Sequence, residues 1–311
     1  MGIALIAEGK YDEAEIYLRQ AAEHGNPDGM ANLGNLLLRQ KRLAEGTEWY
    51  RKASVAGSAY GMVNYGLELA KMGRNEEAED LYKQAATMNS AGGLYELSQV
   101  YAKQGNDEQS ELLTERAVAG GNPSAMLKLA RIMLQRGNPT KAEELYRRAA
   151  KRGPQYQAAL GEYLAKQGRI GEAEPVLERA AEHGEPYAYH CLGVIAAGKG
   201  ELTQAISHYR TAIGYNSIPD ALIQSKVNLA QLLLMTREDD NEKEAEQLCR
   251  DAVAAGSGQG MVLLSLFHKH RGEDDEAQAL IERAQSAEDA GAASALQEYL
   301  NTAPTDSEET G

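Results

Sequence analysis

Alanine recurs along this chain at a nearly constant interval, and that interval limits the fold more than any other feature of the sequence. The positions, which we name the closing alanines, are Ala21, Ala53, Ala85, Ala117, Ala149, Ala180, Ala212, Ala252 and Ala284. Successive spacings are 32, 32, 32, 32, 31, 32, 40 and 32 residues. A fixed period of this length is typical of repeat proteins in which each repeat is one supersecondary unit.

A second small residue precedes each closing alanine by seven positions. The set is Ala14, Gly46, Ala78, Ser110, Ala142, Ala173, Ala205, Ala245 and Ala277. Seven residues make about two helical turns, so both small residues lie on one helix face. A neighbouring helix can therefore approach that face closely. Each repeat is predicted to contain a helix that packs through this face.

Residues that end helices follow at a fixed place, four positions after the closing alanine. They are Gly25, Gly57, Asn89, Gly121, Gly153, Gly184, Asn216 and Gly256, and only Glu288 departs from the pattern. Gly and Asn accept the left-handed conformation found just beyond a helix, so we interpret this position as a C-cap. The other half of each repeat pairs a large residue with a small one, as in Leu33-Gly34 and Leu192-Gly193.

One repeat is thus predicted to be helix, tight turn, helix and cap. Neither helix buries its apolar face alone, so neighbouring repeats must stack to form the core. We predict an all-α fold, an α-solenoid with a right-handed superhelix of about nine helix-turn-helix repeats and a C-terminal capping helix. Residues 1–300 are expected to form this single solenoid, and residues 301–311 an acidic disordered tail.

Three places depart from the period. Gly2 aligns with Gly34, so the first helix lacks its N-terminal half, and either further sequence precedes it or it is a short cap. The 40-residue spacing contains an insertion divided between residues 213–224 and 237–241. Insertions in solenoids usually form loops on one face. A tolerated surface loop is favoured here over a binding loop. Residues 290–300 are expected to form the capping helix.

Charge and cysteine content restrict the partners. The formal net charge is −14, which disfavours nonspecific binding to DNA or to anionic lipid. Residues 1–150 hold 18 basic and 20 acidic side chains, whereas residues 151–311 hold 14 and 26. Two cysteines are too few for a disulfide framework or a zinc cage, which favours a reducing compartment. We predict a cytoplasmic protein with neither a nucleic-acid nor a membrane partner.

Candidate catalytic motifs have simpler explanations. Residues 193–200 (GVIAAGKG) are close to a phosphate-binding loop, but they lack its final Ser or Thr and a preceding strand. His190 and Cys191 are adjacent on a helix, so their side chains do not converge as a nucleophilic pair requires. Cys249 takes the place of Tyr50 in its repeat and is expected to lie in the core. We predict no enzyme activity, cofactor or metal.

The repeat resembles the tetratricopeptide superfamily, and within it the Sel-one-like branch. The resemblance depends on residues 48–53 (EWYRKA), on the junction Gly25-Asn26 and on residues 30–34 (MANLG), and it covers residues 1–300. It implies a scaffold that binds proteins in a concave groove lined by the first helix of each repeat. The groove positions that we select are Asn32, Asn35, Arg39, Tyr60, Asn64, Lys71, Tyr95, Gln99, Lys103, Lys128, Arg131 and Lys166.

Asn32, Asn64 and Asn228 occupy equivalent places in their repeats. An Asn amide both donates and accepts hydrogen bonds, so it can hold an extended peptide backbone. Glu96, Lys128 and Ala159 interrupt this row, and solvated polar positions are an equally good interpretation. The lysine with which chaperone-binding relatives grip a C-terminal carboxylate is missing here, which disfavours that ligand.

The sequence leaves two functions open. The first is a protein–protein interaction adaptor that holds an acidic or neutral peptide across repeats two to six. Tyr60 and Tyr95 would then pack on an aromatic or aliphatic anchor of the peptide. The second is a regulatory or sensor module of a larger protein or complex whose effector lies elsewhere.

Overall fold

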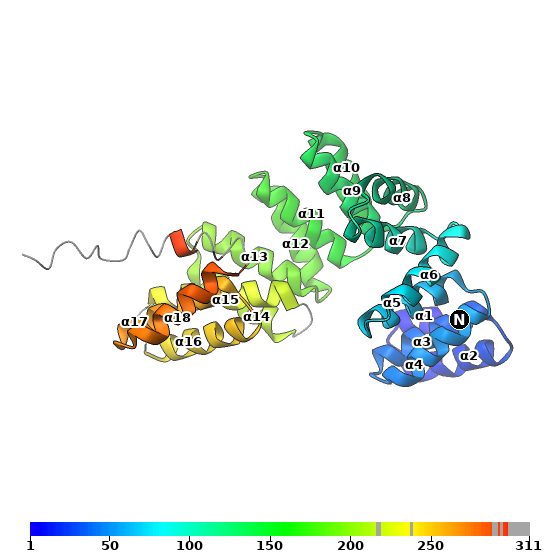
Figure 1. The fold of residues 1–311 in the computed structure, drawn as a ribbon, viewed down its shortest axis with the longest axis horizontal. Helices are drawn as coiled ribbons and strands as arrows, with labels where there is room; N and C mark the ends of the chain where they lie inside the picture. The colour runs from blue at the N-terminus through cyan, green and yellow to red at the C-terminus, as the bar shows by residue number, and fades with distance from the viewer. Residues whose placement is uncertain (216–218, 237–238, 288–291, 293–294, 298–311) are drawn as a thin grey trace, which may run out of the picture. The chain divides into compact units, whose positions relative to one another are not determined.

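The computed structural model describes residues 1–215, 219–236, 239–287, 292 and 295–297. These residues form helices joined by short turns, and none of them lies in a strand. They group into two compact units, Met1–Arg152 and Gly153–Gly311, which we name unit 1 and unit 2. The predicted all-α repeat fold is confirmed (Figure 1).

Unit 1 contains ten helices in five consecutive pairs. Their bounds are α1 Gly2–Ala7, α2 Tyr11–Glu23, α3 Pro27–Arg39, α4 Leu43–Val55, α5 Ala59–Lys71, α6 Asn75–Thr87, α7 Ala91–Lys103, α8 Asp107–Ala119, α9 Pro123–Gln135 and α10 Pro139–Ala150. Odd-numbered helices are the first helices of their repeats, and even-numbered helices are the second. The first helix, α1, has only six residues, which agrees with the alignment of Gly2 with Gly34 in the sequence.

Unit 2 continues the same pattern over its described residues. Its helices are α11 Pro154–Lys166, α12 Ile170–Glu182, α13 Pro186–Gly198, α14 Leu202–Gly214, α15 Pro219–Thr236, α16 Asp239–Ala254, α17 Gly258–His270 and α18 Asp274–Gln285. Of the expected capping helix, residues 295–297 are helical and Ala292 is buried. The rest of that helix and the tail 301–311 lie outside the described residues. That residues 1–300 form one solenoid stays a prediction.

The closing alanines lie in the last turns of the second helices. All are buried except Ala21, which is half-buried. In four repeats the alanine faces a glycine in the following first helix. A Cβ built on Gly61 would lie only 2.6 Å from the Cβ of Ala53, and one on Gly93 only 2.5 Å from that of Ala85. Two helix backbones therefore approach each other as closely as side-chain size allows, which explains why this position does not accept a larger residue.

Within a repeat, a glycine of the first helix accommodates a ring from the second. A Cβ on Gly66 would come within 2.6 Å of the Tyr82 ring, and one on Gly193 within 2.6 Å of the Tyr209 ring. The two rings are almost fully buried. Small residues of the first helix thus leave space for the tyrosine rings of the second helix in these repeats.

The predicted C-caps are confirmed at Gly25, Gly57, Asn89, Gly121, Gly184 and Gly256, all of which have positive φ. The prediction is wrong at Gly153, where φ is 160° and the backbone is extended. Ala149 and Ala180 are 31 residues apart instead of 32, and the missing residue is in the turn that follows α10. Gly153 consequently takes the N-cap position before Pro154, and α10 ends without a left-handed residue. Asn216 lies outside the described residues.

The insertion lengthens helices instead of forming the loops that the sequence predicts. Helix α15 has 18 residues and α16 has 16, whereas 13 is usual in this chain. Residues 219–224 already belong to α15, and residues 239–241 belong to α16. Residues 216–218 and 237–238 lie outside the description. Helix formation satisfies the backbone groups of the inserted residues internally, which a loop would leave to solvent.

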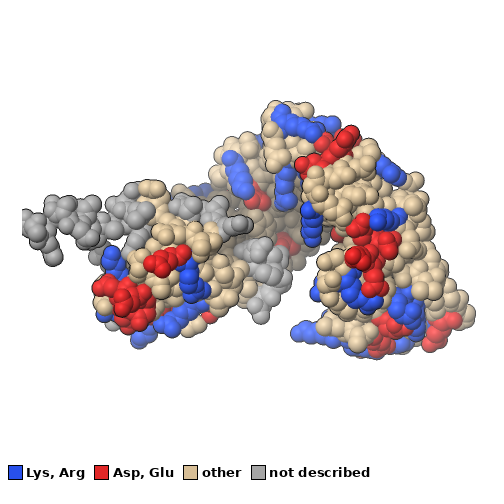
Figure 2. Space-filling view, in the orientation of Figure 1, with Lys and Arg blue, Asp and Glu red and all other residues tan. Residues whose placement is uncertain are grey.

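Polar contacts join neighbouring repeats at a constant separation of 25 residues. In each, a Glu of a second helix accepts from the residue that caps the next first helix: Glu79 from Gln104, Glu111 from Arg136, Glu174 from Lys199 and Glu246 from Arg271. Acidic and basic side chains lie beside one another over the drawn face of each unit (Figure 2). The sequence analysis missed these contacts, although the 25-residue spacing is visible in the sequence.

Enlarging a closing alanine should destabilise the stack. Ala53 is fully buried against Gly61, so Ala53→Leu is expected to lower the free energy of unfolding of unit 1 by about 1–3 kcal/mol through overpacking. Chemical denaturation monitored by circular dichroism measures the change. The control is Ala44→Leu on the exposed face of the same helix, with an expected change within about 0.5 kcal/mol. Equal effects of the two substitutions would contradict the close contact.

Removing the carboxylate of Glu246 should destabilise unit 2 in a pH-dependent way. Hydrogen bonds from Arg271 and Arg250 lower the pKa of Glu246 from 4.5 to about 2, and partial burial opposes them. Because the folded pKa is depressed, the stabilisation is full well above pH 4.5 and is lost as pH falls through about 2. Glu246→Gln is expected to cost on the order of 2 kcal/mol at pH 7, after allowance for the exposed arginines, and only about a quarter of that at pH 2.5.

Urea denaturation of both proteins at pH 7 and pH 2.5 measures this difference. Glu144→Gln is the matched control, because the Glu144 side chain is 67% exposed and lies 3.8 Å from Arg148. That change should have little effect at either pH. A cost of Glu246→Gln that is the same at both pH values would show that the carboxylate charge is not what stabilises this junction.

Candidate functional site

A hollow of about 390 Å³ lies between the first helices α3 and α5 of unit 1. Its lining consists of Asn35, Leu38, Arg39, Tyr50, Asn64, Leu67, Glu68 and Lys71. Four of these, Asn35, Arg39, Asn64 and Lys71, belong to the groove positions selected from the sequence. The structure therefore brings one third of that set together around a single concavity.

Side-chain amides line this hollow in fixed orientations. The Asn35 Nδ2 atom donates to the Tyr60 hydroxyl at 2.8 Å, which links α3 to the start of α5. The Asn64 Nδ2 atom donates to the Tyr60 carbonyl oxygen, also at 2.8 Å. Asn32 makes the same kind of bond to the Asp28 carbonyl one repeat earlier and does not line the hollow. Each amide NH₂ has a second hydrogen in addition to the one used here.

The two basic side chains of the hollow differ in their ion pairing. Lys71 pairs with Glu68 at 2.7 Å within α5. Arg39 is exposed at the end of α3 and has no ion pair among the described residues. Leu38, Leu67 and the Tyr50 ring form the apolar part of the lining. Burial raises the pKa of Tyr50, which keeps its hydroxyl protonated. The hollow thus combines amides, an apolar wall and an available cation.

The groove positions on α7 and α9 are less uniform. Tyr95 and Gln99 are half-buried on α7, Lys103 is exposed in its last turn, and Arg131 is exposed on α9. Glu96, which interrupts the row of asparagines, is half-buried. Burial raises its pKa, and the charge of Lys103 acts in the opposite direction.

Lys128 points between helices of the preceding repeat. Its Nζ atom donates to the Ser98 carbonyl oxygen at 3.1 Å, to the Ser98 hydroxyl at 3.1 Å and to the Ser110 hydroxyl at 2.8 Å. Burial lowers the pKa of this ammonium. The sequence analysis selected Lys128 as a groove cation, but these three bonds give it a structural role between α7 and α8.

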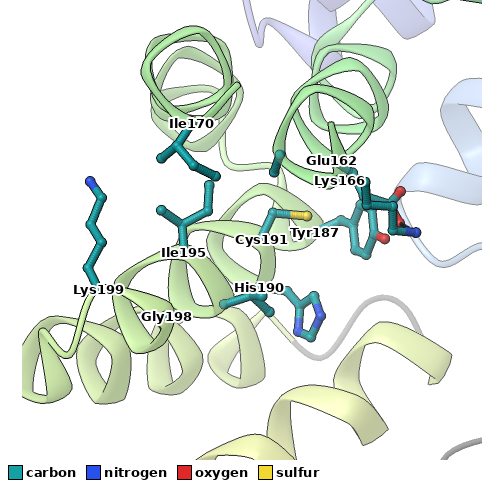
Figure 3. A pocket seen from close by; sticks show the side chains of 11 residues that line it. Glu162, Lys166, Ile170, Tyr187, His190, Cys191, Ile195, Gly198 and Lys199 are labelled. Carbon is teal, nitrogen blue, oxygen red and sulfur yellow. Dashed lines mark hydrogen bonds and ion pairs between the residues drawn. The ribbon is translucent and has the colours of Figure 1, made fainter. Parts of the chain in front are cut away.

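A second hollow, of about 560 Å³, lies between α11 and α13 of unit 2 (Figure 3). Its lining comprises Glu162, Ala165, Lys166, Ile170, Tyr187, His190, Cys191, Val194, Ile195, Gly198 and Lys199. Lys166, the one selected groove residue of unit 2, lies at its edge and pairs with Glu162 at 2.6 Å. The sequence analysis did not predict a cavity here.

The two hollows occupy the same place in the repeat. When Gly34 is aligned with Gly161, and Gly66 with Gly193, seven lining positions coincide. The pairs are Asn35 and Glu162, Leu38 and Ala165, Arg39 and Lys166, Asn64 and Cys191, Leu67 and Val194, Glu68 and Ile195, and Lys71 and Gly198. One position of the solenoid thus presents a polar hollow in unit 1 and a largely apolar one in unit 2.

The His190 and Cys191 side chains both line this hollow (Figure 3), and each contacts Tyr187. The His190 Nδ1 atom lies 2.8 Å from the Ser225 hydroxyl on α15, and its ring stacks on Tyr187 at 5.7 Å. Burial raises the pKa of the Cys191 thiol to about 12 and lowers that of His190. A protonated thiol without a convergent base is a poor nucleophile.

Other predictions about single residues can also be compared with the structure. Cys249 is fully buried, which confirms its expected place in the core. In residues 193–200, Gly193 packs against the Tyr209 ring and Gly200 has the positive φ of a C-cap. The repeat structure therefore accounts for these two glycines without a phosphate-binding loop. Among the described residues, no three His, Cys, Asp or Glu side chains are arranged to hold a metal ion. No helix in the same part of the chain is long and apolar enough to cross a membrane.

Comparison with known proteins reveals related solved structures of low sequence identity. The protective antigen c5321 of uropathogenic Escherichia coli, which displays an SLR fold, shares 22% identity with a TM-score of 0.53, over 87% of this chain and 63% of that one. Cut9 in the APC/C hetero-tetramer Cut9–Hcn1 shares 15% identity with a TM-score of 0.69, over 94% and 60%. The chain thus spans less than two thirds of either protein.

The human IFIT1 dimer, solved with PPP-AAAA, shares 18% identity with a TM-score of 0.54, over 89% of this chain and 68% of that one. At such identities the likeness concerns the fold. That nucleic acid is not a partner of this chain therefore stays a prediction. No curated protein sequence matches the chain.

Sequence profiles of repeat families give a more direct assignment. One tetratricopeptide repeat profile matches residues 1–60, 66–125 and 158–221, which is more than half of the chain, and a second matches residues 123–160. The chain therefore belongs to the tetratricopeptide repeat family, and its fold is shared with Sel-one-like repeat proteins.

Proposed function

We propose that this chain is a non-catalytic protein–protein interaction scaffold that binds an extended peptide segment of its partner along the first helices of unit 1. The hollow between α3 and α5 is its best-defined contact. The observation that carries the proposal is that four independently selected groove residues surround this one hollow. The tetratricopeptide repeat fold, which commonly mediates protein–protein interactions, supports it.

The lining suits a peptide with defined chemistry. Asn35 and Asn64 can each donate a second hydrogen bond to a backbone carbonyl, and their carbonyl oxygens can accept from backbone N–H groups. Leu38 and Leu67 offer an apolar surface to an aliphatic or aromatic side chain. Arg39 can pair with an acidic side chain, since it has no ion pair among the described residues. An acidic or neutral peptide with one apolar side chain could bind the asparagine amides, the leucine surface and Arg39 at the same time.

Further cations extend this preference along unit 1. Lys103 and Arg131 are exposed on α7 and α9. The exposed Lys71 has one ion pair, with the half-buried Glu68 of its own helix. Such pairs contribute little, so Lys71 can exchange Glu68 for a carboxylate of the partner. Lys128 is engaged by Ser98 and Ser110, so we leave it out of the binding surface. Lys166 lines the hollow of unit 2 and is considered separately below.

The proposal predicts a graded loss of affinity. The partner is captured on the immobilised protein from a lysate of its source and reduced by peptide mapping to its shortest binding segment. Fluorescence anisotropy then gives Kd for the labelled segment. Arg39→Glu is expected to weaken binding about tenfold, and the double substitution Asn35→Ala with Asn64→Ala by a similar factor, through lost hydrogen bonds.

Lys141→Glu is the matched control, because it reverses an exposed cation on the second helix α10. It should leave Kd within about twofold of the unsubstituted value. Melting curves verify that each variant is folded. If Arg39→Glu and the double asparagine substitution both bind like Lys141→Glu, the hollow between α3 and α5 is not the binding surface.

A further inference from the structure

The hollow between α11 and α13 differs from its counterpart in unit 1 by a consistent change of chemistry. The polar residues Asn64, Glu68 and Lys71 are replaced by Cys191, Ile195 and Gly198. The volume rises from about 390 to about 560 Å³. A volume of several hundred cubic ångströms with apolar walls and few polar groups is typical of sites for small molecules.

Two small residues keep this hollow open. Ala165 stands where unit 1 has Leu38, and Gly198 stands where it has Lys71. A Cβ built on Gly198 would meet no atom within 4 Å, so neither close packing nor backbone conformation requires glycine there. The other glycines of the same segment, Gly193 and Gly200, are explained by the repeat. Gly198 is therefore best explained by the space it leaves beside Ile195.

Polar groups gather at one end of the hollow. Tyr187, Glu162 and Lys166 lie together there, while Ile170 and Ile195 point toward each other across the other part (Figure 3). The Tyr187 hydroxyl interacts with the Glu162 carboxylate and the Cys191 thiol. Lys166 donates to Glu162, but an ammonium has three donors, and its side chain is 73% exposed. Two donors thus remain for an acceptor on a ligand.

We propose that this hollow binds a small amphipathic carboxylate. Its aliphatic or aromatic body lies between Ile170, Val194 and Ile195, and its carboxylate accepts from Lys166. Lys199 is paired with Glu174, so the ligand's charge is selected at Lys166 and Glu162. An anion is favoured over a cation there, because the Glu162 carboxylate is already engaged by Lys166 and by the Tyr187 hydroxyl, whereas the Lys166 ammonium keeps two donors. The site lies in unit 2 and does not depend on peptide binding in unit 1.

Cys191 provides a reporter inside the hollow. Its thiol lines the cavity, and burial holds its pKa at about 12, so alkylation is slow in the free protein. The other cysteine, Cys249, is fully buried in the core, so Cys249→Ala leaves a single thiol. A molecule that occupies the hollow covers Cys191 and should slow its reaction further.

The test compares three ten-carbon probes that differ only in their headgroups: decanoate, decanol and decyltrimethylammonium. Isothermal titration calorimetry on the full chain, below micelle-forming concentrations, gives their Kd values. We expect decanoate to bind with one-to-one stoichiometry at least about tenfold more tightly than decyltrimethylammonium. Decanoate should also slow alkylation of Cys191 by N-ethylmaleimide at least about fivefold in the Cys249→Ala protein, as expected of a well-occupied site.

Substitutions then locate the bound molecule. Ala165→Leu introduces the residue that unit 1 carries at this position, and Gly198→Leu fills the hollow from α13. Each is expected to weaken decanoate binding about tenfold or more. Ala102→Leu, at the same place on α7 of unit 1, is the matched control and should bind decanoate normally. Lys166→Met should weaken decanoate but leave decanol unchanged.

The proposal fails if both filling variants bind decanoate as tightly as the unsubstituted chain, or if the quaternary ammonium binds equally well. It also fails if decanoate does not slow the alkylation of Cys191. Slower alkylation caused by a leucine-rich peptide, with decanoate inactive, would instead assign the hollow to an apolar side chain of a protein partner. None of these outcomes alters the anisotropy test of Arg39, so the two proposals stand or fall separately.

Discussion

The approach of a closing alanine to a glycine of the next first helix, seen at Ala21, Ala53, Ala85 and Ala252, is the contact on which the packing of these repeats depends. At Ala53 and Gly61, and again at Ala85 and Gly93, no larger side chain fits between the backbones. Single helices of 12 or 13 residues are marginal in water, so they persist here because neighbours cover them. The alanine is therefore a requirement of packing at these junctions, and it fixes how close the second helix lies to the following first helix.

Much of the fold follows from sequence because these packing and capping requirements act locally. A seven-residue pair of small side chains recurs in every repeat, and a residue that accepts the left-handed cap recurs in most of them. The failures have equally local causes. One deleted residue converts Gly153 from a C-cap into an N-cap, and the inserted residues extend α15 and α16 because helix satisfies their backbone groups. The period predicts the structure of a typical repeat. A junction that gains or loses residues occurs only once, so no other repeat in the sequence shows how it folds.

The binding surfaces are harder to predict, because side-chain direction and empty volume depend on several residues together. The repeat register correctly placed Asn35, Arg39, Asn64 and Lys71 around one hollow. It also selected Lys128, whose direction is decided by Ser98 and Ser110, two polar replacements of small residues in the preceding repeat. The cavity in unit 2 depends on Ala165 and Gly198 jointly. Each is unremarkable in a chain rich in alanine and glycine, and only their juxtaposition creates space.

Packing and binding are separated on different faces of the same first helix, and this separation allows the chemistry to vary. Gly61 faces Ala53 and Gly66 faces Tyr82, while Asn64 and Lys71 of the same helix line the hollow. In α13, Gly193 still receives a tyrosine ring, yet Cys191 and Gly198 replace the two polar residues. A substitution at Asn64 or Lys71 therefore leaves the contacts of Gly61 and Gly66 intact. One scaffold can consequently present a polar hollow in one unit and an apolar hollow in the other, because the alanine contact never takes part in either.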